Sequence, residues 1–161
     1  MNDIVISDTT ALIILAKSDA FSLLSNLFQK IYILQAVYDE LMFKDDIVNY
    51  RINAFDRIEV KPVIDMAILE RIKMLKIDKG EVEAISLALE LNLMLIIDER
   101  KGRKIALNQG LKIVGVLGIL IENYRQKFLT LDEVKLNFLL FKQQGLGVSE
   151  QLEKIFFERL V

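Results

Sequence analysis

The sequence predicts an α/β protein built around a doubly wound parallel sheet. Short apolar runs typical of buried strands alternate with longer segments whose apolar residues recur at helical spacing. The connections between these segments are short, as they are in strand–helix–strand units. The composition is 53% hydrophobic and 27% charged, which suits a sheet whose strands are buried on both faces.

The expected elements fill the whole chain. Strands are predicted at residues 4–7, 31–34, 58–60, 93–97 and 112–114. Helices are predicted at residues 11–16, 21–28, 35–42, 45–55, 65–75, 81–91, 100–109, 116–127, 131–141 and 149–160. No repeat or linker interrupts the order, so residues 1–161 are expected to form one domain with a helical C-terminal extension from about 130 to 161.

The absence of two residue types narrows the chemistry. The 161 residues include no Cys and no His, which excludes disulfides, thiolate or histidine metal sites, and a Ser-His-Asp triad. Catalysis would have to use carboxylates, Lys, Arg, hydroxyl groups or a hard metal ion. Oxygen ligands favour Mg²⁺ or Mn²⁺ over Zn²⁺.

Charge and hydropathy limit the expected partners and location. The net charge of −2 is not that of a free-standing nucleic-acid-binding module, although a carboxylate site beside a local basic patch can still hold phosphate. No apolar run approaches the ~20 residues that span a bilayer. The N-terminus lacks the features of a secretory signal. We therefore expect a cytoplasmic protein with no membrane partner.

Acidic residues stand where the predicted strands end or the helices begin. Asp8 ends the first strand, Asp98 ends the strand at 93–97, and Glu81 starts the helix that leads into that strand. Glu40 lies about one turn into the helix after the second strand. In a parallel sheet these side chains share one edge, where a divalent cation would relieve the repulsion between them.

Each acid also has a purely structural interpretation. Asp8 could cap a helix, and Asp98 could be a turn residue after a strand. Glu40 could be a solvated helix residue, and Glu81 could simply be stabilised by the positive N-terminus of its helix. Either Glu81 or Glu83 could face the site, because two residues that are two positions apart on a helix cannot face the same way. Apolar residues flank both, so the periodicity does not decide which one faces inward.

Basic residues follow Asp98 directly. Arg100, Lys101, Arg103 and Lys104 are placed either to contact phosphates beside a cut bond or to form the solvated face of a helix. Arg100 and Lys101 are the better candidates for phosphate contact, because they lie nearest to Asp98.

The blocks Val-Ile-Ser-Asp-Thr-Thr at 5–10, Asp-Lys-Gly-Glu-Val-Glu-Ala-Ile at 78–85 and Ile-Asp-Glu-Arg-Lys-Gly-Arg at 97–103 resemble PIN-domain proteins. The closest branch is the small prokaryotic one related to VapC toxins. The resemblance implies a three-layer α/β/α sandwich with a central parallel sheet of four to five strands plus C-terminal helices. It also implies a Mg²⁺- or Mn²⁺-dependent ribonuclease that acts as a toxin and is restrained by a cognate antitoxin.

The same resemblance assigns roles to individual residues. The acidic quartet falls on Asp8, Glu40, Glu81 or Glu83, and Asp98. The expected metal ligands are Asp8, Asp98, Glu81 and Glu83, and the expected catalytic residues are Asp8, Glu40, Glu81 and Asp98. The Thr that usually stands two residues before the last acid is replaced by Ile96. Contacts to substrate phosphate are expected from Arg100, Lys101 and Thr10.

The sequence also allows other functions. A non-catalytic PIN scaffold that binds RNA or a protein partner is the alternative. A phosphoacceptor receiver domain ranks last, because no Lys ends the strand before residue 116, and no Gly-x-Gly-x-x-Gly motif of a dinucleotide site follows the first strand. Apolar faces of the helices at 19–28 and 45–55 and of the C-terminal pair predict a homodimer, an antitoxin groove, or both.

Overall fold

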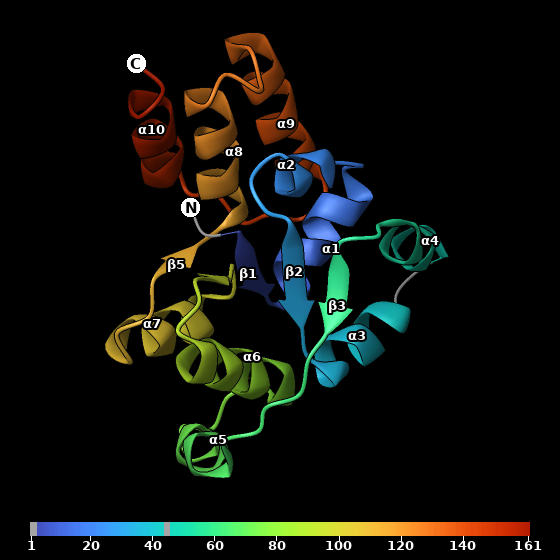
Figure 1. Ribbon diagram of the computed structural model, residues 1–161. Coiled ribbons are helices and arrows are strands. Elements are labelled where there is room, and N and C mark those ends of the chain that lie inside the picture. The colour runs from blue at the N-terminus through green and yellow to red at the C-terminus, as the bar shows by residue number, and fades with distance from the viewer. Residues whose placement is uncertain (1–2, 44–45) are drawn as a thin grey trace.

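The residues described by the computed structural model, 3–43 and 46–161, form one sheet of five parallel strands in the order β3-β2-β1-β4-β5 (Figure 1). The strands are β1 (Ile4–Ser7), β2 (Lys30–Ile33), β3 (Ile58–Val60), β4 (Leu95–Ile96) and β5 (Ile113–Val114). The predicted α/β class and the predicted parallel sheet of four to five strands are therefore confirmed.

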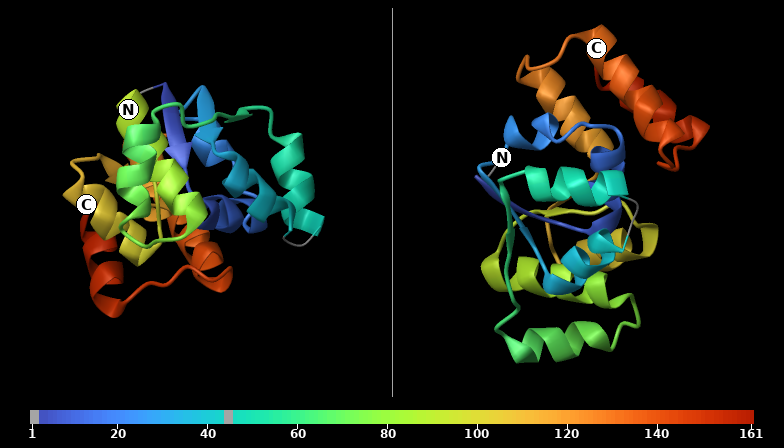
Figure 2. Two further views of the ribbon diagram at one scale, coloured as in Figure 1. Left: turned by 90° about the horizontal axis from the view of Figure 1, so that it is seen from below. Right: turned by 90° about the vertical axis from the view of Figure 1, so that its right-hand side faces the viewer.

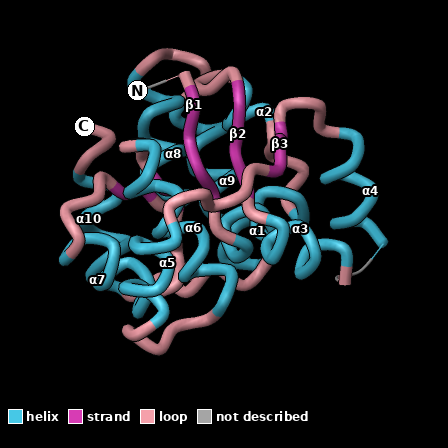
Figure 3. The backbone as a smooth tube through the Cα atoms, turned by 60° about the horizontal axis from the view of Figure 1, so that its bottom comes forward, coloured by secondary structure: helices cyan, strands magenta, loops and turns pink. Residues whose placement is uncertain are grey.

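Helices cover both faces of the sheet, as a doubly wound order requires. They are α1 (Thr9–Lys17), α2 (Ser22–Ser25), α3 (Gln35–Met42), α4 (Asp46–Ala54), α5 (Met66–Lys73), α6 (Lys79–Leu91), α7 (Arg100–Asn108), α8 (Val116–Arg125), α9 (Leu131–Gln143) and α10 (Glu150–Glu158). In the right-hand view of Figure 2, α1, α2 and α8 lie above the sheet, and α6 with the outlying α5 lies below it. Figure 3 shows how short the strands are beside this helical cover.

Apolar side chains hold the central strands between the two helical layers. Val5, Ile6, Leu95, Ile96 and Ile97 are completely buried, and each such side chain contributes roughly 1.5–3 kcal/mol to stability through its removal from water. Complete burial of Ile96 explains the apolar residue at this position: the side chain belongs to the core.

The boundaries of several elements differ from the predicted ones by a few residues. Helix α1 begins at Thr9 because Asp8 caps it. Strand β4 is shorter than the predicted 93–97, although the hydrogen bonds with its neighbours extend from Met94 to Ile97. Residue 45, the first of the predicted helix 45–55, lies outside the described residues. None of the described helices is long and apolar enough to cross a bilayer.

The C-terminal helices pack on α8 and on each other. Helix α9 begins with a capping box between Thr130 and Glu133 and lies against α8. The ring of Phe138 on α9 stacks on Phe156 of α10 at 4.9 Å between centroids and lies 5.1 Å from Phe157. These aromatic contacts fix the position of α10 relative to α9.

Candidate active site

Asp8 connects two elements at the carboxyl edge of the sheet. One carboxylate oxygen, Oδ1, accepts a hydrogen bond from Ala11 N in the first turn of α1 at 2.9 Å. The other, Oδ2, accepts one from Asp98 N, just after β4, at 3.0 Å. Asp8 is therefore a helix cap, one of the two interpretations of the sequence, and at the same time lies in the cavity described next.

A cavity of about 100 Å³ opens at this edge, between the starts of α1, α6 and α7 and the side of α3. Carboxylates predominate in its lining, and no Lys or Arg of the described residues contributes to it. The lining residues are Asp8, Thr9, Thr10, Glu40, Asp78, Gly80, Glu81 and Glu99. Gly80 keeps α6 close to α3, because a Cβ atom there would lie 2.9 Å from Glu40 Oε1.

Two acids of this cavity, Asp8 and Glu81, have raised pKa values. Burial raises the pKa of Asp8 to about 7, and the charge of Asp98 adds to the rise, although backbone N–H groups partly oppose it. Burial also raises the pKa of Glu81 to about 8, with further contributions from the charges of Glu99 and Asp78. A cation bound in this cavity would offset both the burial and the repulsion.

Asp98 faces away from this cavity, toward the start of α8. Its Oδ2 accepts a hydrogen bond from Val116 N at 2.9 Å, and the Arg103 guanidinium adjoins it. Burial raises the pKa of Asp98, while the Val116 N–H and Arg103 oppose the rise. A Cβ atom on Gly115 would lie 2.5 Å from Asp98 Oδ1, so glycine is needed there for this close approach.

The structure distinguishes the two glutamates at the start of α6. Glu81 lines the acidic cavity, and Glu83 is half-buried on the same helix and is not among the lining residues. Glu40 also lines the cavity. Throughout the described residues, no group of three or more acidic side chains is arranged closely enough to hold one metal ion directly.

The predicted phosphate-binding residues have different surroundings. Thr10 lines both the acidic cavity and a larger groove beside it, and Arg100 is exposed at that groove. The Lys101 ammonium donates a hydrogen bond to the Lys76 carbonyl at 3.1 Å, which ties α7 to the turn before α6. Arg103 donates to the Ile97 carbonyl at 2.7 Å, and Lys104 is exposed.

Two acids of the cavity were missing from the predicted site. Glu99 caps α7 by accepting hydrogen bonds from Lys101 N and Gly102 N. Asp78 precedes α6 and makes no capping hydrogen bond with its side chain. Both stand directly before helices at the carboxyl edge of the sheet. The position directly before a predicted helix, which identified Asp8 as a site residue, could also have identified Asp78 and Glu99 from the sequence.

Comparison with known proteins identifies the family. The family model DUF3368, described as a PIN domain, matches residues 4–160. This chain belongs to the PIN-domain family. The predicted family is thus confirmed, and because PIN domains are generally nucleases, this PIN domain belongs to a family of nucleases.

Solved structures were also compared with this fold. A chain from the crystal structure of VapBC2 from Rickettsia felis, bound to a DNA fragment from their promoter, has a TM-score of 0.54 at 17% identity. The match covers 70% of this chain and 98% of that one. A PilT N-terminus domain protein from Sulfolobus solfataricus gives a TM-score of 0.48 at 17% identity over 74% of this chain and 92% of that one. No curated protein matches the sequence significantly.

Proposed function

We propose that this PIN domain is an endoribonuclease that depends on Mg²⁺ or Mn²⁺ and acts as the toxin of a toxin–antitoxin pair. The observation that carries the proposal is the cavity at the carboxyl edge of the sheet, where five carboxylates meet without a neutralising Lys or Arg among the described lining residues. Ligand sites of open parallel sheets lie at this edge. Membership of a nuclease family supports phosphodiester hydrolysis as the reaction.

The donor set of the cavity fits a hard divalent cation. Mg²⁺ is usually bound through one or two carboxylates and keeps several of its waters, so three directly coordinating acids are not needed. Asp8 and Glu81 are the candidates to hold the ion, since their raised pKa values reflect burial and repulsion that a cation would offset. Glu40, Glu99 and Asp78 are placed to hold its waters. When bound, the ion supplies activation of water and stabilisation of the leaving oxygen.

The other residues orient the substrate and the acids. Asp98 donates its backbone N–H to Asp8 and so holds that carboxylate toward the cavity. Thr10, at the junction of the cavity and the neighbouring groove, offers a hydroxyl to a phosphate oxygen. Arg100 is exposed in the same groove and offers a guanidinium, and Lys101 is a second candidate once its hydrogen bond to Lys76 is released.

Cleavage of RNA with Mg²⁺ or Mn²⁺ tests the proposal. We expect Asp8→Asn and Glu81→Gln to reduce the rate of cleavage by two or more orders of magnitude, the scale on which loss of an electrostatic group slows a reaction. Asp98→Asn keeps the backbone N–H that binds Asp8, so it should reduce the rate less. Glu83→Gln is the matched control, because it removes the same charge from the same helix outside the cavity, and it should cleave like the wild type. Wild-type rates in both Asp8→Asn and Glu81→Gln would refute the assignment.

A non-catalytic binding module is the second candidate. It is favoured by the absence, among the described residues, of three acidic side chains arranged around one ion position. Calorimetry with Mn²⁺ separates the two functions. Heat of binding that disappears in Glu81→Gln and persists in Glu83→Gln supports the nuclease, and absence of metal binding in the wild type supports the binding module.

A cognate antitoxin and a second copy of the chain are the proposed protein partners, and the cytoplasm is the proposed location. The similarity of the fold to a chain of the VapBC2 complex supports an antitoxin. Exposed apolar side chains support a protein interface: Phe43 is 91% exposed, and Tyr50 on α4 is 71% exposed. Light scattering of the purified protein should give the mass of a dimer. A monomer that stays a monomer at high concentration would contradict this.

A further inference from the structure

We infer that the groove between α7, α8 and α10 binds the single-stranded RNA next to the cut bond, an inference that rests on the proposed function. The groove encloses about 800 Å³ and lies beside the acidic cavity. Residues of all three helices line it, so α7 and α10 border the same groove although they are far apart in the sequence.

The groove is continuous with the candidate active site. Thr10 lines both spaces, and Asp98, whose N–H donates to Asp8, lies at the inner end of the groove. A nucleotide chain whose phosphate sits at Thr10 would therefore leave the acidic cavity through this groove. This continuity with the acidic cavity favours the RNA substrate as the occupant of the groove over a segment of a partner protein.

The charges of the lining favour an anionic occupant. Arg100, Arg103 and Arg159 line the groove, and Asp98 is the only acid among its described lining residues. Arg103 is already engaged within the protein, because it donates to the Ile97 carbonyl at 2.7 Å and its charge opposes the rise in the pKa of Asp98. Arg100 and Arg159 are exposed and are the guanidinium groups left to meet phosphates, which they bind in bidentate geometry.

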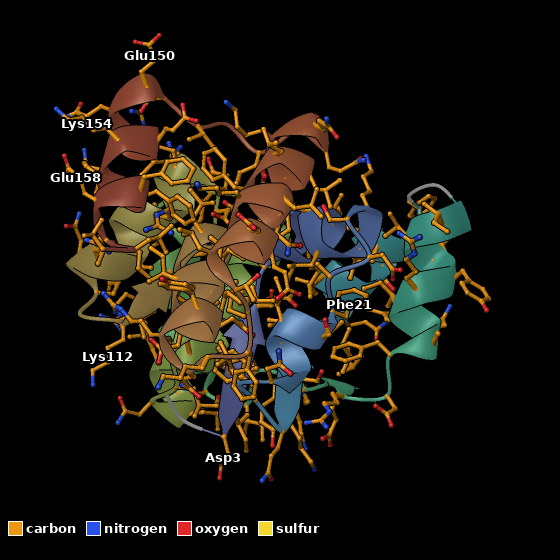
Figure 4. The ribbon with its side chains drawn as sticks, turned by 90° about the horizontal axis from the view of Figure 1, so that it is seen from above. Asp3, Phe21, Lys112, Glu150, Lys154 and Glu158 are labelled. Atoms are coloured by element: carbon orange, nitrogen blue, oxygen red, sulfur yellow. The ribbon has the colours of Figure 1, made fainter. Side chains whose placement is uncertain are left out.

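The walls of the groove suit bases and riboses. Leu117 and Ile121 contribute from α8, and Leu152 and Ile155 contribute from α10, where each is 41% exposed. The opposite face of α10 is charged: Glu150, Lys154 and Glu158 project outward in Figure 4. Helix α10 thus presents an apolar wall with one arginine to the groove, and an ordinary solvated face to water.

The fold itself does not require a glycine at position 147, which lies in the groove. A Cβ atom on Gly147 would meet nothing within 4 Å, and its φ is not in the left-handed region. Gly145, two residues earlier, has φ +102° and needs glycine for that reason. Because the fold itself leaves room for a side chain at 147, the bare backbone there is suited to close approach by a nucleotide in the groove.

Binding of RNA by the uncleaving Asp8→Asn protein tests the inference. We would measure the fluorescence anisotropy of labelled single-stranded RNA at several salt concentrations. In this background Arg159→Ala should weaken binding about fivefold, as expected for one exposed phosphate contact, and should reduce the slope of log Kd against log salt by roughly 0.7. Gly147→Ala should also weaken binding. Arg125→Ala is the matched control, because it removes an exposed arginine outside the groove.

The outcomes separate this inference from the proposed function. If the wild type cleaves RNA and Arg159→Ala raises KM for a long substrate but not for a dinucleotide, with kcat unchanged, the inference holds. If the wild type cleaves RNA, but Arg159→Ala binds like wild type or loses no more affinity than Arg125→Ala, the inference is wrong and the function stands. If Arg159→Ala loses only a protein partner, the groove is a docking surface and the inference is wrong. If the wild type neither binds nor cleaves RNA, both fail.

Discussion

The stability of this protein in the absence of divalent metal should fall as the pH rises from 4 to 7, because of Asp8. The pKa of Asp8 is about 7 in the folded protein against an ordinary value of 3.8. The folded state therefore binds a proton that the unfolded state has released over this range. The resulting stabilisation is complete below the unfolded pKa and is lost as the pH passes the folded pKa.

The size of the effect follows from the two pKa values. Their separation of about 3 corresponds to about 4 kcal/mol at 25 °C. A small domain is typically stable by roughly 5–15 kcal/mol in total, so the loss is a large part of the whole. Glu81 acts in the same direction between its ordinary pKa of 4.5 and about 8, with a smaller effect because it is only half-buried.

Asp8→Asn isolates the contribution of Asp8. Asparagine keeps one acceptor oxygen, so one of the two backbone N–H groups that Asp8 satisfies, those of Ala11 and Asp98, loses its acceptor. This costs about 1–3 kcal/mol at every pH. The wild type should therefore be more stable than the variant at pH 4 and less stable at pH 8, and the two stability curves should cross between these values.

Urea unfolding followed by circular dichroism, in buffers with a chelator, measures both curves. The quantity to compare is the difference in unfolding free energy between wild type and Asp8→Asn at each pH, since other titrating groups are common to both proteins. A difference that is constant with pH, or that grows in favour of the wild type as the pH rises, would refute the account of Asp8 as a buried carboxylate of raised pKa.

Three further predictions follow from the same geometry. Mn²⁺ at about a hundred times its Kd should stabilise the wild type at pH 8 by roughly 2.7 kcal/mol; thermal shift should show this in Glu83→Gln and not in Glu81→Gln. Gly115→Ala should displace the Asp98 carboxylate from Val116 N. We expect the free energy of unfolding to fall by about 1–3 kcal/mol and the rate of cleavage to fall as well. If the variant unfolds and cleaves like the wild type, the close approach of Gly115 to Asp98 has no such role. Ile96→Thr should lower stability by about 2–4 kcal/mol because it places a hydroxyl at a fully buried site, and a thermal melt equal to that of the wild type would count against this.

The sequence predicted the order of strands and helices well because the signals are local. Apolar runs such as residues 4–7 and the glycine that ends α7, Gly110 with φ +82°, depend on a few neighbouring residues. The sequence also predicted that Asp8 lies at the end of a strand, because the apolar run at 4–7 stops there. Its placement beside an acidic cavity follows from parallel strands alone.

The details of the site were not predictable in the same way. The choice between Glu81 and Glu83 depends on how α6 is rotated against β1 and β4, and apolar residues flank both positions. Asp98 turns from the cavity because the N–H of Val116 and the guanidinium of Arg103 attract it, and these contacts arise only from the packing of α8 and α7. That Glu99 lines the cavity and Asp98 does not follows from the cap that Glu99 forms on α7.

The hydrogen bond from Asp98 N to Asp8 joins residues 90 positions apart, and this separation matters during synthesis. The ribosome releases the chain from its N-terminus, so β1 and α1 emerge long before β4. Until β4 has emerged and paired with β1, Asp8 lacks one of its two backbone donors, and the acids of α6 and α7 are not at its side. A chain that ends before β4 and α7 therefore has no assembled acidic cavity. For a protein proposed to cut RNA, the site can form only after about two thirds of the chain has been made.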